Sequence, residues 1–314
     1  MIKKIVIYFL LTTLFLYGLR KLHYRGLLKQ TAGYYEKYNT AFINKNNFNV
    51  IFLGSSRAEM HYNTYIFDSL TKQNSFNLSL AGATPQVAFA ALKAYLLNSK
   101  APEYLFYEID YHFLKYESNE IKNFNNYFPY LFNKVLLKEF AKIDTRMPYF
   151  YYNPYYSWPY IGFKNISTSL HGWLNIPTQL DSLYYKGYFK ESLRPSLKFT
   201  NIKPHCSYLS ITNRNYLDSI ITICKNNNTK ITLISSPIFA GGNVDLLNKN
   251  QIVNQVKNIA KINRVNYLDL SSLPFCNNRE LFIDHYHLNY SGATKYTIKL
   301  SSIFNNKIVG FSLK

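Results

Sequence analysis

The sequence predicts a three-layer α/β protein: a five-stranded parallel sheet with helices on both faces, preceded by an N-terminal transmembrane helix. Three observations predict it: an apolar run near the N-terminus, an alternation of strand-like and helix-like segments from residue 48 onward, and small or polar residues directly after several strand-like segments. Alternating strands and helices pair in parallel through right-handed crossovers. With 314 residues, of which 47% are hydrophobic, the chain can support a core of this size.

The N-terminal apolar run covers residues 5–19 and follows two lysines. At about 1.5 Å per residue it is slightly short for a membrane span, unless the flanking lysines snorkel. It also fits the apolar core of a signal peptide, but basic residues follow it in place of an Ala-x-Ala-like cleavage site. We therefore expect an uncleaved anchor over residues 1–22. Basic residues flank both ends, so the positive-inside rule does not decide the orientation.

A polar, partly helical neck is expected over residues 23–47, and the α/β domain over 48–314. The expected strands are the short apolar runs at 49–53, 75–80, 103–109, 230–235 and 265–270. The expected helices cover 62–70, 84–97, 213–225, 251–262 and 291–304. The second helix begins with Thr84 as an N-cap and Pro85 in its first turn, which is typical of helix starts.

Small or polar residues follow the strands and predict a common site. They are Gly54-Ser55-Ser56 after the first strand, Gly82 after the second, Asp110 after the third, Ser236-Pro237 after the fourth, and Asp284 to His287 between the fifth strand and the last helix. Ligands of open parallel sheets bind outside the carboxyl ends of the strands. These segments are therefore expected to converge at one edge of the sheet.

Residues 113–205 interrupt the alternation and are rich in aromatic residues, densest between 149 and 160. We interpret them as an insertion that packs over the strand ends as a cap, where aromatic rings could stack on sugar rings or hold acyl chains. In the alternative interpretation, the rings form the insertion's own small core or touch the membrane.

The composition restricts the classes of partner and cofactor that we expect. The formal charge of +19 favours an anionic partner, unless it reflects a general bias toward Lys, Asn, Ile, Tyr and Phe. No basic stretch has the length or glycine spacing of a nucleic-acid motif, so no nucleic-acid partner is expected. Cys206, Cys224 and Cys276 lack the spacing of metal ligands and allow at most one disulfide. We expect neither a metal nor a cofactor.

Ser56 is the candidate nucleophile. A strand-to-helix turn would expose its hydroxyl and leave its backbone N–H near a helix N-terminus, where it could stabilise an oxyanion. Ser55 is the rival nucleophile. Alternatively, both serines only cap the following helix.

Asp284 and His287 are the candidate partners of that serine. At an i, i+3 spacing the carboxylate could hold the imidazole tautomer while the other ring nitrogen faces Ser56. An Asp-x-x-His pair can also be a structural hydrogen bond, and His285 and Asp269 are substitute candidates.

Three of these motifs resemble conserved blocks of the SGNH/GDSL hydrolase superfamily. Residues 51–56 resemble its first block, with Ser56 at the nucleophile position. Residues 77–82 are similar to its second block, whose final glycine, here Gly82, donates its N–H to the oxyanion hole. Residues 284–289 resemble the last block. The resemblance covers about 48–112 and 208–305, and it implies a flavodoxin-like fold with Ser56, His287 and Asp284 as the catalytic triad.

The chain departs from that family in two blocks. Ser55 stands at the usual aspartate position of the first block. The third block normally supplies an Asn-Asp pair whose asparagine completes the oxyanion hole, but here the third strand ends in Glu108-Ile109-Asp110. Because a carboxylate would repel a developing oxyanion, we expect Asp110 to turn elsewhere, leaving the N–H groups of Ser56 and Gly82 as donors. Membrane-anchored branches that modify envelope polymers also depart from the first block.

The resemblance therefore implies a membrane-anchored serine esterase or O-acyltransferase that acts on ester-linked acyl groups of a cell-envelope glycan or lipid. We expect a single-pass protein of the inner or cytoplasmic membrane, with the catalytic domain outside the cytoplasm and a membrane acyl-donor protein as a further partner. Arg57 and Asp110 are weaker candidates for substrate binding, and Arg57 is alternatively a solvated surface residue.

Two other functions remain open. One is a non-catalytic binding or assembly component of an envelope polysaccharide pathway with a degenerate site, favoured by Asp110 and the aromatic insertion. The other is a flavodoxin-like nucleotide binder, which would lack the usual glycine-rich phosphate loop.

Overall fold

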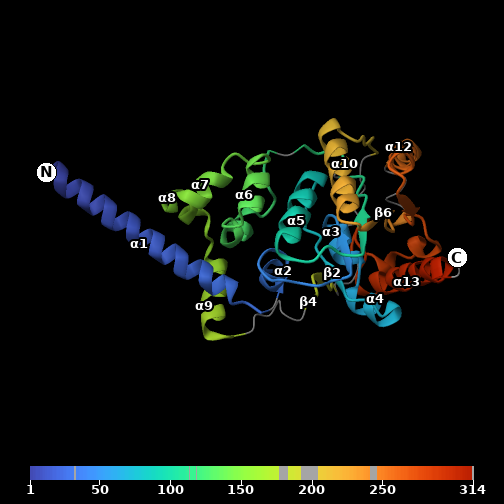
Figure 1. The fold of residues 1–314 in the computed structure, drawn as a ribbon, viewed down its shortest axis with the longest axis horizontal. Helices are drawn as coiled ribbons and strands as arrows, with labels where there is room; N and C mark the ends of the chain where they lie inside the picture. The colour runs from blue at the N-terminus through green and yellow to red at the C-terminus, as the bar shows by residue number, and fades with distance from the viewer. Residues whose placement is uncertain are drawn as a thin grey trace.

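The computed structural model describes residues 1–312 apart from 32, 113, 118, 177–182, 192–203 and 241–245. These residues form an α/β protein around a five-stranded parallel sheet of order β2-β1-β3-β6-β7 (Figure 1). The strands are β1 (Val50–Leu53), β2 (Ser75–Asn77), β3 (Tyr104–Glu108), β6 (Lys230–Ser235) and β7 (Asn266–Asp269). The predicted parallel five-stranded sheet is confirmed.

Successive strands are added to the sheet in opposite directions on the two sides of β1: β2 lies on one side, and β3, β6 and β7 lie on the other. Both neighbours of β1 pair with it in parallel, β2 on one side and β3 on the other. The ends of β1 and β3 therefore flank a topological switch point, which is the usual ligand crevice of such sheets.

The second strand is shorter than predicted, because the chain leaves the sheet after Asn77. The Asn77 side chain donates to the carbonyl of Ala58 (2.8 Å) and accepts from the N–H of Ser79 (3.1 Å). These bonds satisfy backbone groups that a longer strand would leave to the sheet.

The two faces of the sheet bury separate apolar clusters. Along β1, Ile51 and Leu53 belong to one cluster, whereas Val50 and Phe52 belong to the other. This alternation follows from the two-residue period of a strand. All four residues are buried, as expected of a central parallel strand.

Helices cover both of these faces. On one lie α3 (Ser56–His61), α4 (Thr64–Thr71) and α13 (Tyr290–Ser312), and on the other lie α5 (Pro85–Asn98), α10 (Ile211–Asn226) and α12 (Lys249–Ile262). The predicted Thr84 cap of α5 is confirmed, since its side chain accepts from the N–H of Val87. The helix predicted at 62–70 is α4, and a separate short helix, α3, precedes it.

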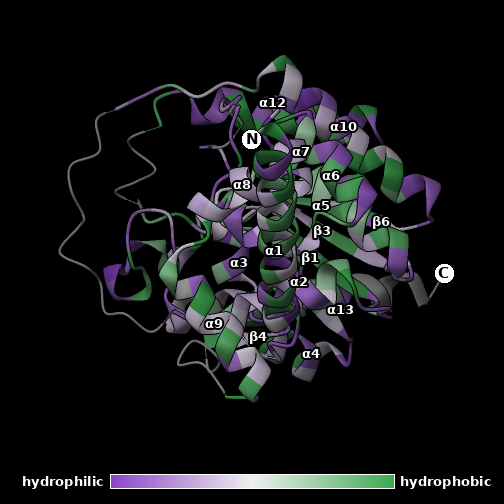
Figure 2. Ribbon diagram, turned by 90° about the vertical axis from the view of Figure 1, so that its left-hand side faces the viewer, coloured by the Kyte–Doolittle hydropathy of each residue, from purple (hydrophilic) through white to green (hydrophobic). Residues whose placement is uncertain are grey.

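The N-terminal helix α1 (Ile2–Leu28) is, among the described residues, the one helix long and apolar enough to cross a membrane. Its first part projects away from the rest of the molecule in Figure 1 and is largely hydrophobic in Figure 2. The helix continues beyond the expected anchor end at residue 22. Arg20 is buried and donates to the carbonyl of Phe150 (3.2 Å) and to Ser157 Oγ (3.2 Å). The last turns of α1 thus pack on the insertion.

The described part of the insertion packs mainly beside the sheet domain. It contains η1 (Phe124–Tyr130), α6 (Lys134–Ala141), α7 (Met147–Tyr152), α8 (Pro154–Ser157), η2 (Trp158–Tyr160), α9 (Phe163–Leu174) and the hairpin β4 (Tyr184–Tyr185) with β5 (Tyr188–Phe189). Helices α8 and α9 contact α1, and α6 contacts α5. Phe124, Phe150 and Tyr160 form a ring cluster of their own. The prediction of a cap over the strand ends falls partly on 177–182 and 192–203, outside the described residues.

Candidate functional site

The turn from β1 into α3 presents two serines in different environments. Ser55 is the N-cap of α3, and its side chain accepts from the N–H of Arg57. Ser56 is the first helical residue and is partly exposed. Gly54 permits the turn, because a Cβ there would lie 2.7 Å from Glu108 Cβ and 2.9 Å from Ala58 Cβ. The same turn thus buries one hydroxyl and exposes the next.

Ser56, His287 and Asp284 form a continuous hydrogen-bonded series. Ser56 Oγ lies 2.9 Å from His287 Nε2. His287 Nδ1 lies 2.9 Å and 3.0 Å from the two carboxylate oxygens of Asp284. Because a carboxylate can only accept, Nδ1 carries the proton and Nε2 is free to accept the Ser56 hydroxyl. The structure thus brings Ser56 into contact with a His–Asp pair that lies more than 220 residues later in the sequence.

The Asp284 carboxylate is held in its charged form. It accepts the backbone N–H groups of Tyr286 (2.8 Å) and His287 (2.9 Å) as well as the imidazole. Burial alone would raise the pKa of Asp284, but the hydrogen bonds and charge of His287 and these two N–H groups outweigh it and lower the pKa. An ionised Asp284 can stabilise an imidazolium at His287.

Gly82 lies in a loop tied to the serine turn. The N–H of Leu80 donates to the carbonyl of Gly54 (3.0 Å), which brings the two loops side by side. Gly82 has φ of +76°, a left-handed conformation that favours glycine. A Cβ at Gly82 would also meet Lys122 Cδ at 2.4 Å. Ser56, as the first residue of α3, has an N–H without an intrahelical acceptor.

The neck contributes to the same region. Helix α2 (Gly33–Phe42) carries Lys37, whose buried ammonium donates to Glu59 Oε1 on α3 (2.7 Å) and to the carbonyl of Ser79 in the Gly82 loop. One lysine therefore links the neck, α3 and the Gly82 loop.

Asp110 turns away from the exposed serine. It accepts the Ser55 hydroxyl (2.5 Å) and the N–H of His112 (3.0 Å), and it lies 3.8 Å from Arg57 Nη1. Ser55 is 1% exposed, so its hydroxyl is committed to Asp110 and removed from the surface. The geometry places Ser56, and not its rival, beside the imidazole.

Arg57 is buried, which corrects the expectation of a solvated side chain. It is 2% exposed, and its Nη2 lies 3.3 Å from Glu108 Oε1 and donates to the carbonyl of Ser236 (2.7 Å). Burial would lower the pKa of Arg57, but the neighbouring carboxylates of Glu108 and Asp110 raise it. The guanidinium therefore stays charged and neutralises the buried carboxylates of Glu108 and Asp110.

Sequence reasoning missed a buried polar network behind the serine turn. Glu108 accepts from Tyr62 Oη (2.5 Å) and from the Ser236 hydroxyl (2.8 Å). His61 Nε2 accepts the N–H of Leu288 (2.9 Å), so its Nδ1 carries the proton that faces Ser236 Oγ (2.8 Å). The signal in the sequence was Glu108 itself, a carboxylate inside an apolar strand. Leu288 directly follows His287 in the chain, so this hydrogen bond connects the network to the backbone beside His287.

His61 should make stability depend on pH. Burial, followed by the charges of Arg57 and His287, holds the pKa of His61 well below its usual range. The unfolded chain binds a proton near pH 6.5 that the folded state excludes, so stability falls as pH falls below that value. We expect the slope in urea unfolding between pH 7 and 5.5 to be shallower in His61→Asn, by up to about 1.4 kcal/mol per pH unit. Equal slopes in the two proteins would contradict a neutral His61.

Asp269 and His285, the substitute candidates for the aspartate and histidine, form hydrogen bonds with other residues. Asp269, at the end of β7, accepts from the Ser271 hydroxyl (2.6 Å) and N–H (3.1 Å). The carbonyl of His285 accepts the N–H of Phe239 (3.0 Å), and its ring packs on Phe239. His287 therefore pairs with Asp284. Within the described ranges, no group of three or more His, Cys, Asp or Glu side chains could hold a metal ion.

Fold and site together define an α/β protein in which a serine at the end of β1 is hydrogen-bonded to a histidine and an aspartate from the loop that precedes α13. The model of a family of uncharacterised proteins matches residues 196–312, just over a third of the chain. That match includes Asp284 and His287 and leaves out Ser56. No curated protein matches the chain.

Proposed function

We propose that this protein is a membrane-anchored, SGNH-like serine esterase or O-acyltransferase that acts on ester-linked acyl groups of a cell-envelope glycan or lipid. The observation that carries the proposal is the 2.9 Å approach of Ser56 Oγ to His287 Nε2, with Asp284 on the other ring nitrogen. A serine hydroxyl needs such a base and such an orienting group to become a nucleophile. The flavodoxin-like order of the sheet also supports it, because the serine follows β1 at the switch point.

The chemistry would proceed in two half-reactions. Ser56 Oγ attacks the ester carbonyl while His287 Nε2 takes its proton, and Asp284 stabilises the imidazolium. The tetrahedral intermediate collapses, His287 returns the proton to the departing alcohol, and the acyl group stays on Ser56. Water or a sugar hydroxyl then attacks this ester with His287 again as the base. The products are a free acid or a new ester, together with the regenerated serine.

Two backbone donors would hold the oxyanion, the N–H groups of Ser56 and Gly82. Asp110 bonds to Ser55 and faces Arg57, so its charge is neutralised away from the developing oxyanion. The asparagine donor of related sites is missing, and losing one donor typically costs about 10²–10³ in rate. We therefore propose an enzyme that is slow toward simple esters.

The apolar helix α1 would anchor the protein in the inner or cytoplasmic membrane as a single-pass protein. The proposed location of the catalytic domain is outside the cytoplasm, where envelope glycans and lipids are modified. A membrane protein that supplies acyl groups is the proposed partner if the reaction is transfer.

The second candidate function is a non-catalytic binding component of an envelope polysaccharide pathway. The presence of Asp110 where the related sites carry asparagine favours it, since that residue provides no oxyanion donor. Under this proposal the serine, histidine and aspartate would remain as a structural hydrogen-bonded series.

Labelling with a fluorophosphonate separates the two functions, because it requires an activated serine but no turnover. In the full-length protein in detergent, we expect Ser56 to be labelled, and His287→Asn to slow labelling at least about 100-fold, the lower end of general-base contributions. Ser219→Ala, which alters a partly exposed serine on α10, is the matched control and should label normally. A folded protein whose Ser56 stays unlabelled would support the binding component.

A further inference from the structure

A second cavity lies at the opposite edge of the sheet from Ser56. Its volume is about 660 Å³, and it is lined by strand residues, by α13 and by the C-terminal ends of α10 and α12. Tyr104, Lys230 and Asn266 line it, and each stands at the start of its strand. The serine turn follows the carboxyl end of β1. The cavity is therefore separate from the proposed catalytic site, and its volume is within the range of about 300–1,000 Å³ that ligand sites occupy.

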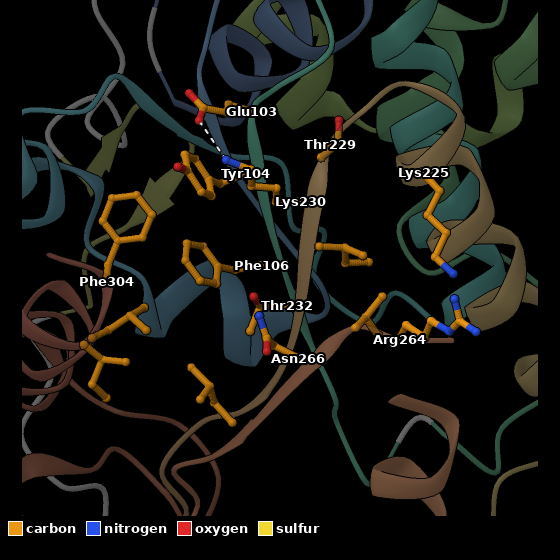
Figure 3. Close-up of a pocket in the computed structure, with 15 residues that line it drawn as sticks. Glu103, Tyr104, Phe106, Lys225, Thr229, Lys230, Thr232, Arg264, Asn266 and Phe304 are labelled. Atoms are coloured by element: carbon orange, nitrogen blue, oxygen red, sulfur yellow. Dashed lines mark hydrogen bonds and ion pairs between the residues drawn. The ribbon is translucent and has the colours of Figure 1, made fainter. Parts of the chain in front are cut away.

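One side of the cavity is apolar. The rings of Tyr104 and Phe106 come from β3, and Phe304 from α13 packs against both, with centroid distances of 5.0 Å and 5.9 Å. Leu268 and Leu300 extend this surface. Figure 3 shows the three rings on the same side of the cavity. An apolar chain would find van der Waals contacts here without any need for hydrogen bonds.

The other side carries two cations. Lys225 comes from the last turn of α10, and Arg264 follows the C-cap residue of α12. Their charged ends point toward each other in Figure 3. Lys230 is already paired with Glu103 (3.4 Å). Among the residues that the structure describes, Lys225 and Arg264 form no ion pair with a carboxylate. Glu103 also lines the cavity but is the partner of Lys230, so the two neighbouring cations Lys225 and Arg264 favour an added anion between them.

The backbone of Arg264 is unfavourable for an arginine. Its φ is +52°, in the left-handed region that glycine commonly fills after a helix end. A side chain there costs about 1 kcal/mol relative to glycine. The partial negative charge at the end of α12 favours a cation, but glycine would end the helix without this strain. Arg264 therefore places a guanidinium at the cavity in a backbone conformation that glycine would adopt with less strain.

We propose that this cavity binds an amphiphile with one anionic head and one apolar chain. Lys225 and Arg264 bind the head, and Tyr104, Phe106 and Phe304 receive the chain. This site goes beyond the proposed esterase function, because it uses none of the residues at the serine turn.

The test uses Ser56→Ala full-length protein in zwitterionic nanodiscs, with empty nanodiscs as the reference. Calorimetric titration with octyl phosphate should show saturable binding, at least about tenfold tighter than octanol, since charge-assisted hydrogen bonds discriminate by this much or more. Inorganic phosphate should bind at least about tenfold more weakly than octyl phosphate, because it lacks the chain. Equal affinity for octanol, or for inorganic phosphate, would overturn the amphiphile proposal.

Arg264→Gly is the decisive variant, because it removes the charge and also relieves the left-handed strain. We expect an unchanged or higher melting temperature together with at least about a tenfold loss of octyl phosphate affinity. Lys72→Gly is the matched control: it also removes a cation at positive φ (57°), outside the cavity, and should bind as the parent does. Lys225→Met should lose affinity as well.

If both cavity variants fold and keep the parent affinity, the proposal is overturned. Binding is measured without turnover and in the Ser56→Ala background. A failure here therefore leaves the fluorophosphonate result unaffected, and the two proposals fail separately.

Discussion

Ser56→Ala is expected to lower the hydrolysis of a short-chain aryl acetate by the full-length protein by roughly 10⁴-fold or more. The substitution removes the hydroxyl oxygen that lies 2.9 Å from His287 Nε2, so the proposed acyl-enzyme could not form. The Ser56 side chain is partly exposed and does not cap α3, which Ser55 does, so the melting temperature should change little. The measurement is the initial rate against substrate concentration, with thermal unfolding of both proteins alongside.

Ser55→Ala is the matched control for this prediction. It removes the neighbouring hydroxyl, which caps α3 and donates to Asp110 at 2.5 Å. We expect it to retain the nucleophile but to cost about 1–3 kcal/mol of stability, because a cap and a buried hydrogen bond are lost. Unchanged turnover in folded Ser56→Ala would exclude Ser56 as the nucleophile. Loss of turnover only in folded Ser55→Ala would transfer that role to the rival serine.

Among the substitutions considered, Arg57→Met is expected to give the largest loss of stability, about 3–5 kcal/mol in urea unfolding at pH 7. The guanidinium lies 3.3 Å from Glu108 and 3.8 Å from Asp110, and all three side chains are buried. Methionine fills a similar volume but leaves both carboxylates without their cation. Removing one member of a buried ion pair costs more than the pair contributes, because the remaining charge is desolvated and unpaired.

Two comparisons give this second prediction its specificity. Adding Glu108→Gln to Arg57→Met should recover part of the loss, because one uncompensated charge disappears. Arg214→Met, which removes an exposed pair with Asp218 at 2.9 Å, should cost below about 0.5 kcal/mol. A loss in Arg57→Met as small as that of Arg214→Met would show that the buried network contributes little to folding.

Much of the α/β scaffold was predictable because its signals are local. The strand β6 was predicted with its observed bounds, and α5 was predicted within one residue at each end, since Thr84 and Pro85 mark its start. The end of β2 was missed, because it depends on an Asn77 side chain that reaches the carbonyl of Ala58 on another element. The short helix α3 was missed for a different reason: its six residues contain too few turns to show an apolar period.

The candidate site was predictable in its residue types and not in its contacts. Position after a strand was enough to select Gly54, Ser56 and Gly82. The burial of Arg57 was not predictable, because an arginine after a serine turn has the same local signal whether it faces solvent or a buried carboxylate. Ser236 was selected by its position after a strand, but His61 and its contact with Ser236 were missed, since the two residues are 175 positions apart and meet only in the folded chain.

The sequence by itself determined where strands and helices form, which residues end them, and which nucleophile, base and carboxylate are available. It determined these because periodicity, caps and turn residues act over a few positions. Only the tertiary structure decided that Ser56 meets His287 across 231 residues, that Ser55 turns inward to Asp110, and that Arg57 is buried between two acids. Those outcomes depend on strand order and on the balance between desolvation and charge pairing, and neither is a property of any short segment.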